Sequence, residues 1–400
     1  MSVTGDSAVK RELRVLHVFA ALGVGGAETW LLSLLRYFRE HEESLPYKVT
    51  IDVLLTGGAP ATLDDEARAL GANLFYVPYS KSQLAGFSRQ FRSLLKRGRY
   101  DAIHDHQEHT AGLHFFLGAG ALPRVRAVHF HNPPTMRSRD YQGRGGQLIT
   151  GVGYFFVRMF STHLLGTSSQ NLVEQRMDQD HVPRRIYSGP LHCGFETEHF
   201  AGDQKSARSD LREELELEED TRLLLFVGRL HTDARFNQKN PGFALEVAIE
   251  CMKRDPRVRA IFAGSGDAGQ QDLQRRADDA GFAQRVRFLG LRSDVPRLML
   301  GSDVLLFPSF AEGLGMVAVE AQAAGLRVFA SDAVPKECVV VPDLVSFLPL
   351  TAGANPWARK VLESLSESRP NHMECNMAVR SSAFSIENSA SSLLRIYAAK

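Results

Sequence analysis

The feature that most constrains the fold is an alternation of short aliphatic runs with longer amphipathic stretches along almost the whole chain. Such an alternation is typical of parallel βαβ units, in which a helix follows each strand and returns the chain to the same edge of the sheet. In the first half, strands are expected at 13–20, 47–56, 73–78, 100–106, 125–132 and 161–168. Helices are expected at 27–40, 62–71 and 82–98. The pattern predicts an α/β fold.

The same alternation begins again after residue 200. Strands are expected at 222–230, 258–264, 285–290, 303–309 and 327–332, and helices at 206–219, 241–254, 270–281 and from Met316 onward. With 400 residues the chain exceeds the ~150 residues of an ordinary domain.

The two runs therefore predict two Rossmann-like, doubly wound domains, 1–195 and 196–380, joined near GPLHCGFETEHF, with a helix in 381–400 that packs back on the first. Because such folds bind ligands at the carboxyl ends of their strands, we expect the domains to face a shared cleft.

Composition narrows the class of partner. The formal net charge is +1, which argues against nucleic acid as a general partner. Residues 1–195 hold 22 Lys and Arg against 17 Asp and Glu, and the remainder holds 25 against 29. This asymmetry suggests that the first domain faces something anionic, although scattered surface charges would give the same count. Four widely spaced cysteines favour a reducing compartment over a disulfide framework or metal cluster.

One segment combines two acidic residues with glycines at the start of an expected helix: FAEGLGMVAVE, 310–320. Glycines let backbone N–H groups approach a ligand, and a helix N-terminus carries partial positive charge, so this segment suits a diphosphate. Glu312 and Glu320 are poor phosphate ligands but good acceptors for sugar hydroxyls. A nucleotide sugar has both kinds of group. The alternative is an ordinary strand–loop–helix with surface glutamates.

Several motifs together resemble the GT-B glycosyltransferases of family 4, most of all the exopolysaccharide and capsule-type members. The resemblance covers nearly the whole chain and rests on EGLGMVAVEAQAAG, a Glu-x7-Glu motif, and on GVGGAE, AIHDHQEH, AVHFHNPP, FVGRL followed by QKNP, and VRFLGLRSDVPRLMLGSDVLLFPS. It implies a GT-B fold with an N-terminal acceptor-binding domain and a C-terminal domain that binds a nucleotide sugar.

The resemblance also implies roles for residues of the second domain. Glu312 is expected to act catalytically by contacting the donor sugar or its leaving phosphate region, and Glu320 to hold the ribose hydroxyls. Arg229 and Lys239 are expected to bind the diphosphate, together with the backbone of Gly313, Leu314 and Gly315. The chain departs from the family in the longer spacing between Arg229 and Lys239, so Arg235 is an alternative phosphate ligand. It also has Cys193 where the family has asparagine.

In the first domain, Gly25 and Gly26 close the loop after the first strand, where the resemblance implies close approach of acceptor and donor phosphate. A dinucleotide fingerprint is a weaker alternative, because the glycine spacing differs. His106 matches the family histidine beside the reacting sugar, and His131 follows a neighbouring strand. A structural role is the alternative for any single histidine.

We therefore expect a metal-independent, retaining glycosyltransferase that moves a hexose from a UDP- or GDP-linked donor to a hydroxyl of a polysaccharide or lipid-linked glycan. The leaving phosphate is expected to help deprotonate the acceptor, and no cofactor is expected. A nucleotide-sugar epimerase of the same fold and a non-catalytic nucleotide-sugar-binding protein are the alternatives. DQD at 178–180 imitates a metal motif of other glycosyltransferases, but it follows a helical pattern and not a strand.

The expected location is the cytoplasm, with peripheral contact to an anionic membrane. No stretch has the ~20 apolar residues that a spanning helix needs. The segment GQLITGVGYFFVRMF, 146–160, is apolar enough to lie on a bilayer. Basic side chains near it in the sequence are Arg124, Arg126, Arg137, Arg139 and Arg144.

Overall fold

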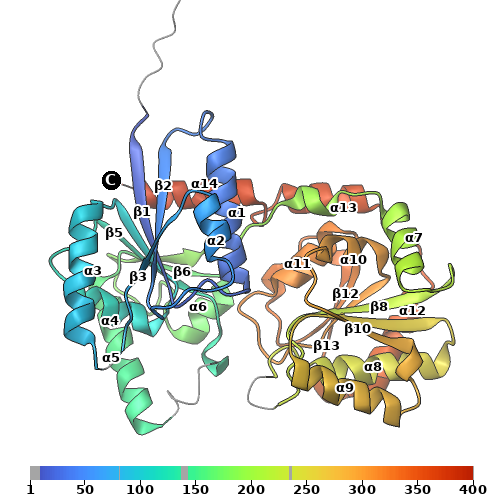
Figure 1. Cartoon of the computed structure of the whole chain (residues 1–400). Coiled ribbons are helices and arrows are strands. Elements are labelled where there is room, and N and C mark those ends of the chain that lie inside the picture. Colours follow the sequence, from blue (N-terminus) through green and yellow to red (C-terminus); the bar gives the residue numbers. More distant parts are fainter. Residues whose placement is uncertain (1–9, 81, 137–142, 234–236, 400) are drawn as a thin grey trace, which may run out of the picture. The chain divides into compact units, whose positions relative to one another are not determined.

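The structure is a computed structural model of the chain, and it describes residues 10–80, 82–136, 143–233 and 237–399. The chain divides into two compact units: unit 1 comprises Met1–Phe195 with Ile386–Lys400, and unit 2 comprises Glu196–Ser385. Each unit is built around one parallel sheet flanked by helices (Figure 1). The prediction of two doubly wound α/β domains is confirmed. The shared cleft stays a prediction.

The sheet of unit 1 has the strand order β3-β2-β1-β4-β5-β6-β7, with neighbouring strands parallel. Its strands are β1 (Glu12–Phe19), β2 (Lys48–Leu55), β3 (Asn73–Tyr76), β4 (Ala102–Asp105), β5 (Val125–Phe130), β6 (His163–Gly166) and β7 (Tyr187–Pro190). Strands β2 and β3 are added in turn on one side of β1, and β4 to β7 are then added in turn on its other side. The boundary between β1 and β4 is therefore a topological switch point, where ligands of such sheets bind.

The helices of unit 1 pack on both faces of this sheet (Figure 1). They are α1 (Gly26–Glu40), α2 (Asp64–Ala69), α3 (Leu84–Gly98), α4 (His109–Leu117), α5 (Arg144–Phe160), α6 (Ser169–Gln175) and α14 (Ile386–Tyr397). Helices α4 and α5 cross closely because Gly112 and Gly153 lack side chains: a Cβ atom at Gly112 would lie 2.0 Å from the carbonyl oxygen of Gly153. Fully buried aromatic rings such as Phe87, Phe115 and Phe130 fill the core beneath α3 and α4.

The sheet of unit 2 has the order β10-β9-β8-β11-β12-β13. Its strands are β8 (Arg222–Val227), β9 (Val258–Ala263), β10 (Val286–Gly290), β11 (Val304–Phe307), β12 (Arg327–Ser331) and β13 (Val345–Leu348). Its helices are α7 (Gln204–Glu214), α8 (Pro241–Arg254), α9 (Asp267–Asp279), α10 (Val295–Gly301), α11 (Met316–Ala323), α12 (Ala354–Ser364) and α13 (His372–Arg380). The switch point of this sheet lies between β8 and β11.

Short 3-10 helices complete the chain: η1 (Pro134–Met136), η3 (Thr197–Phe200), η4 (Ala283–Arg285), η5 (Lys336–Cys338), η6 (Pro342–Leu344) and η7 (Leu350–Ala352). The four cysteines, Cys193, Cys251, Cys338 and Cys375, are free and buried. Within the described ranges, no helix combines the length and the apolar character needed to cross a bilayer.

Candidate active site

In unit 2, predicted site residues gather where β8 and β11 end, on either side of the switch point. Arg229 follows β8, and its guanidinium Nη2 donates to Gln238 Oε1 at 3.1 Å. The side-chain N–H of Gln238 in turn donates to the backbone carbonyl of Ala311 at 3.0 Å, and the backbone carbonyl of Gln238 accepts from the N–H of Phe310 at 2.8 Å. The segment after β8 is thus fastened to the loop after β11. Arg235 lies outside the described residues.

Lys239 and Glu312 form an ion pair at the same place, with Nζ 2.8 Å from Oε1. The side chain of Glu312 is 6% exposed and that of Lys239 is 22% exposed. The ammonium also lies 5.2 Å from the centre of the Phe307 ring. Because one of three ammonium N–H groups is used by Glu312, the others are available to an oxygen ligand. Two residues 73 positions apart therefore place a cation and a carboxylate side by side.

Gly315 caps helix α11 in the left-handed region, with φ of 95°. A Cβ atom there would lie 2.9 Å from the Phe307 ring, so both the backbone angle and the packing require glycine. Gly313 and Leu314, which precede it, are buried. The N-terminus of α11 thus begins directly after the loop that carries Glu312, as the sequence predicts.

Glu320 lies in the second turn of α11 and is half-buried. Burial raises the pKa of its carboxyl to about 7, an effect that the positive charge of Lys239 partly offsets. Among the described residues, its carboxylate has no hydrogen-bond or ion-pair partner, in contrast to Glu312. The two glutamates of the motif therefore have different electrostatic surroundings.

In unit 1, the predicted glycine loop follows β1 at the switch point of that sheet. Gly25 is the N-cap of α1 in an extended conformation, and Gly26 begins the helix. A Cβ atom at Gly26 would meet no atom within 4 Å. The packing of the protein does not explain glycine at this position, so ligand approach stays the predicted reason.

A cluster of five histidines lies at the ends of β1, β4 and β5. It comprises His17, His104, His106, His129 and His131. His17 and His104 are register partners in neighbouring strands. His106 and His131, the two predicted site residues, are joined by a hydrogen bond of 2.8 Å between Nδ1 of His106 and Nε2 of His131. The structure thus brings these two together and adds three further rings.

Burial keeps these imidazoles neutral. It lowers the pKa of His17 to about 3 and that of His131 to about 4, and it lowers the pKa of the other three well below the ordinary value. Two sets of three rings bring nitrogen atoms within 4.8 Å of one another, which is a spacing open to a metal ion. Several of these nitrogens are already engaged with one another, since His106 lies within hydrogen-bond distance of both His17 and His131.

The DQD segment lies in a turn after α6, where Asp178 Oδ1 is 2.5 Å from Nδ1 of His181. This is the local context that the sequence indicates, a helix end and not a strand end. Sequence reasoning did not select His17 of this cluster as a site residue, nor Tyr397 of the C-terminal helix, whose hydroxyl contacts His104 and His17. The period-2 spacing of His104 with His106 and His129 with His131 is the signal that locates the cluster.

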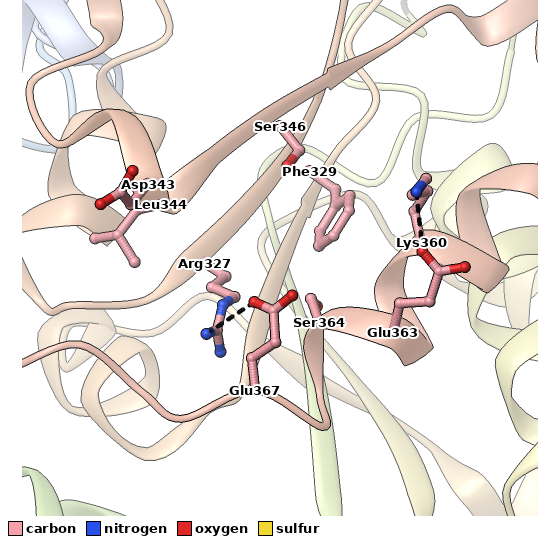
Figure 2. Close-up of a pocket in the computed structure, with 9 residues that line it drawn as sticks. All are labelled: Arg327, Phe329, Asp343, Leu344, Ser346, Lys360, Glu363, Ser364 and Glu367. Carbon is pink, nitrogen blue, oxygen red and sulfur yellow. Dashed lines mark hydrogen bonds and ion pairs between the residues drawn. The ribbon is translucent and has the colours of Figure 1, made fainter.

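A separate cavity of about 220 Å³ opens between β12, β13 and α12 (Figure 2). Arg327 begins β12, so the cavity lies toward the amino ends of the strands, away from the loop with Glu312. Four of its five charged side chains pair with one another: Arg327 with Glu367 at 3.3 Å, and Lys360 with Glu363 at 2.9 Å, while Asp343 is the fifth (Figure 2). We do not assign it to the candidate site.

Two parallel doubly wound units, each with polar side chains at its switch point, are the architecture of the GT-B fold. The chain matches the models of Glycosyltransferase Family 4 over residues 24–170 and of Glycosyl transferases group 1 over residues 221–366. It belongs to this family of glycosyltransferases.

Two similar proteins match over nearly their full lengths. EpsF of Bacillus subtilis, named as a glycosyltransferase, is 27% identical over 96% of both chains. The capsular polysaccharide biosynthesis glycosyltransferase CapH of Staphylococcus aureus is 25% identical over 97% of this chain and 99% of its own. Among solved structures, Anabaena HepE in complex with UDP and glucose has a TM-score of 0.74 at 17% identity, covering 97% of this chain and all of its own.

Proposed function

We propose that the protein is a retaining glycosyltransferase that transfers a sugar from a nucleoside diphosphate donor to a hydroxyl of a polysaccharide or lipid-linked glycan. The observation that carries this proposal is the meeting of the Lys239–Glu312 pair with the start of α11 at the switch point of unit 2. A cation, a carboxylate and a helix N-terminus together suit a diphosphate joined to a sugar. The name of CapH supports a polysaccharide acceptor, and the UDP bound to HepE favours UDP over GDP in the donor.

In this reaction the bond from the sugar C1 to the diphosphate oxygen breaks, and a bond from C1 to the acceptor oxygen forms on the same face. The acceptor proton passes to the leaving diphosphate. Arg229, Lys239 and the N-terminus of α11 would stabilise the negative charge that develops on the leaving oxygen. These groups would serve in place of a bound metal ion.

The test is a panel of UDP- and GDP-linked sugars, first by thermal shift and then by release of the nucleoside diphosphate with and without a glycan acceptor. We expect one donor to stabilise the protein by about 2.7 kcal/mol at 100-fold over its dissociation constant. We expect turnover in excess EDTA and a product that retains the anomeric configuration. Complete loss with EDTA, restored by manganese, would refute metal independence, and an inverted product would refute retention.

The same panel separates the two alternatives. An epimerase of this fold would convert one nucleotide sugar into another with an inverted ring carbon. A non-catalytic binding protein would show a thermal shift without release of diphosphate or change of the sugar. Either result would overturn glycosyl transfer as the function.

We also propose that unit 1 contacts an anionic membrane through α5. Leu148, Val152, Phe155 and Met159 recur at intervals of four, three and four residues, so they share one face of the helix, and each is 40–69% exposed. Phe116 of neighbouring α4 is 49% exposed and adds to this apolar surface, stacking on Phe156 at 4.4 Å.

Charge supports the choice of an anionic bilayer. Between residues 109 and 173 the chain has six arginines and one acidic residue, Asp140. Helix α3, which packs beside α4, exposes Arg89, Arg92, Lys96 and Arg97. Arg126 contributes less than its position in the sequence suggests, because it is half-buried and donates to the carbonyls of Phe160 and Pro123. Arg137 and Arg139 lie outside the described residues.

A further inference from the structure

The last helix of the chain reaches the histidine cluster of unit 1. The ring of Tyr397 is fully buried, and its hydroxyl lies 2.5 Å from Nδ1 of His104 and 3.2 Å from Nε2 of His17. Elsewhere on the same helix, Ser389 accepts from the indole N–H of Trp30 at 3.0 Å and donates to the carbonyl of His192 at 2.9 Å. Helix α14 is thus fixed to unit 1 by buried hydrogen bonds at two places.

Hydrogen bonds continue from Tyr397 through successive rings. Nδ1 of His17 is 3.0 Å from Nε2 of His106, and Nδ1 of His106 is 2.8 Å from Nε2 of His131. Both nitrogens of His17 and of His106 are therefore engaged. This chain of hydrogen bonds runs from the buried ring of His104 to His131, which is half-buried at the end of β5.

Which atom donates in each of these hydrogen bonds can be deduced. A neutral imidazole has one N–H donor and one lone-pair acceptor, so fixing one hydrogen bond fixes all the others. If the Tyr397 hydroxyl donates to His104, then the proton of His104 lies on Nε2, which is buried without a partner in the described part of the chain. If His104 donates to Tyr397 instead, Nε2 is only a lone pair. An unpaired buried N–H is the rarer state in proteins, so the second direction is favoured.

In the favoured direction Tyr397 donates to His17, His17 to His106, and His106 to His131. His106 then has no free nitrogen for a ligand, whereas His131 accepts at Nε2 and must carry its proton on Nδ1. Nδ1 of His131 has no partner among the described residues. The donor that this cluster leaves unengaged among the described residues is therefore this N–H group, on a half-buried ring.

We propose that Tyr397 is a positioning residue that sets the tautomers of His17, His106 and His131, so that His131 presents a fixed Nδ1–H donor to an oxygen of the reacting sugars. The identity of that ligand rests on the proposed function, but the tautomers do not. The C-terminal helix thereby becomes part of the machinery of the first unit, although it follows the whole second unit in the sequence.

The experiment uses full-length protein labelled with ¹⁵N-histidine and long-range ¹H–¹⁵N correlation, which distinguishes Nδ1–H from Nε2–H tautomers. In the wild type we expect His17, His106 and His131 as Nδ1–H tautomers and His104 likewise. In Tyr397→Phe, the hydrogen bonds that join His17 to His104 through the tyrosine hydroxyl are lost, so we expect both tautomers at His106 and His131. We also expect at least a twofold loss of kcat with little change in donor KM.

Ser389→Ala is the matched control, since it removes a buried hydrogen bond from the same helix without touching the imidazoles. We expect a lower Tm but unchanged tautomers and kcat. An Nε2–H tautomer at His131 in the wild type would overturn the proposal, even if Tyr397→Phe does not fold. So would unchanged tautomers in Tyr397→Phe. Absence of transferase activity with the expected tautomers would instead count against the proposed function alone.

Discussion

At the scale of residues, the two glutamates of the motif are distinguished by their partners. Glu312 is nearly inaccessible to solvent and is held by the ammonium of Lys239. Glu320 has no such partner among the described residues, and burial raises its pKa. A carboxylate in a loop beside the donor sugar can stabilise the positive charge that develops on the sugar ring in the transition state. A carboxylate on the adjacent helix is better suited to a contact that persists throughout the reaction.

The first prediction follows from this difference. A ribose contact exists before and after transfer, so Glu320→Gln should raise donor KM more than it lowers kcat. Contacts of Glu312 should strengthen in the transition state, so Glu312→Gln should lower kcat by about 10²-fold. Steady-state kinetics on both folded variants checks this. The reverse pattern would exchange the roles, and two unaffected variants would make both glutamates structural.

The second prediction concerns pH. The folded pKa of Glu320 is raised from 4.5 to about 7, so ionisation of this carboxyl disfavours the folded state. Its destabilising effect should be absent below pH 4.5, should grow as the pH rises, and should be complete above pH 7. Glu320→Gln should therefore be more stable than the wild type at pH 8, by about 1–3 kcal/mol after allowance for partial exposure. Urea unfolding at pH 4.5 and 8 measures it, and equal stability at pH 8 would contradict it.

The third prediction separates the two cations. Arg229→Ala and Lys239→Ala should each weaken nucleoside diphosphate binding by about 1.5–3 kcal/mol, as expected for a charged hydrogen bond. Only Lys239→Ala should also lower the stability of the ligand-free protein, because it leaves the buried carboxylate of Glu312 without a counter-charge. Calorimetric titration and thermal unfolding test the two effects. Normal binding by Lys239→Ala together with weak binding by Arg235→Ala would assign the phosphate contact to Arg235.

At the scale of elements, the sequence predicts the central strands and most of the longer helices, because their aliphatic runs and amphipathic periods are long, but it gives no bounds for the 17-residue α5. Helix α8, for example, covers the expected 241–254. The edge strands β7 and β13 were not predicted. Each has four residues, and β7 reads Tyr-Ser-Gly-Pro, so only pairing with a neighbouring strand makes it extended.

Some contacts of the candidate site could likewise be predicted from the sequence, and others could not. Glu312, Gly315 and Glu320 lie within one local segment, so a motif suffices to find them. The partnership of Lys239 with Glu312, and that of Tyr397 with His17, join residues 73 and 380 positions apart. Such pairs result from strand order and from the return of α14 to unit 1, which no local pattern encodes.

The fourth prediction concerns the element that carries the site loop. Asp303 immediately precedes β11 and is 10% exposed; it accepts from Arg208 at 2.6 Å, from Arg369 at 2.8 Å and from the backbone N–H of Leu223 at 2.7 Å. These arginines hold the pKa of Asp303 below its usual range. Asp303→Asn should destabilise unit 2 by about 3–5 kcal/mol, since the buried guanidinium of Arg212 and the partly buried ones of Arg208 and Arg369 lose their counter-charge.

Because the folded pKa of Asp303 is depressed, its contribution to stability should be present above pH 4 and lost on acidification. The difference in stability between the wild type and Asp303→Asn should therefore shrink as the pH falls below this value. Denaturant unfolding of both proteins at pH 7 and pH 3 checks both parts. A variant as stable as the wild type at pH 7 would show that the arginines find other acceptors.

At the scale of the whole molecule, the two units are built alike but differ in surface chemistry. Both place polar side chains at the switch point of a parallel sheet. Unit 1 combines a basic helix, α3, with an apolar stripe on α5. A soluble donor needs no such surface, whereas an acceptor attached to a lipid would be brought to unit 1 by membrane contact. This division agrees with the proposed roles of the two units.

The last prediction tests that contact by flotation with vesicles of anionic phospholipid. Each basic side chain near such a surface contributes about 1 kcal/mol, and this attraction is screened by salt. The wild type should therefore float at low salt and less at high salt. The double variant Leu148→Glu and Phe155→Glu should fail to float, because it puts negative charge on the apolar stripe. Met377→Glu, a similarly exposed apolar position in unit 2, is the control and should float normally. Equal flotation of all three proteins would locate membrane contact elsewhere, and failure of the wild type to float would refute the proposed membrane surface.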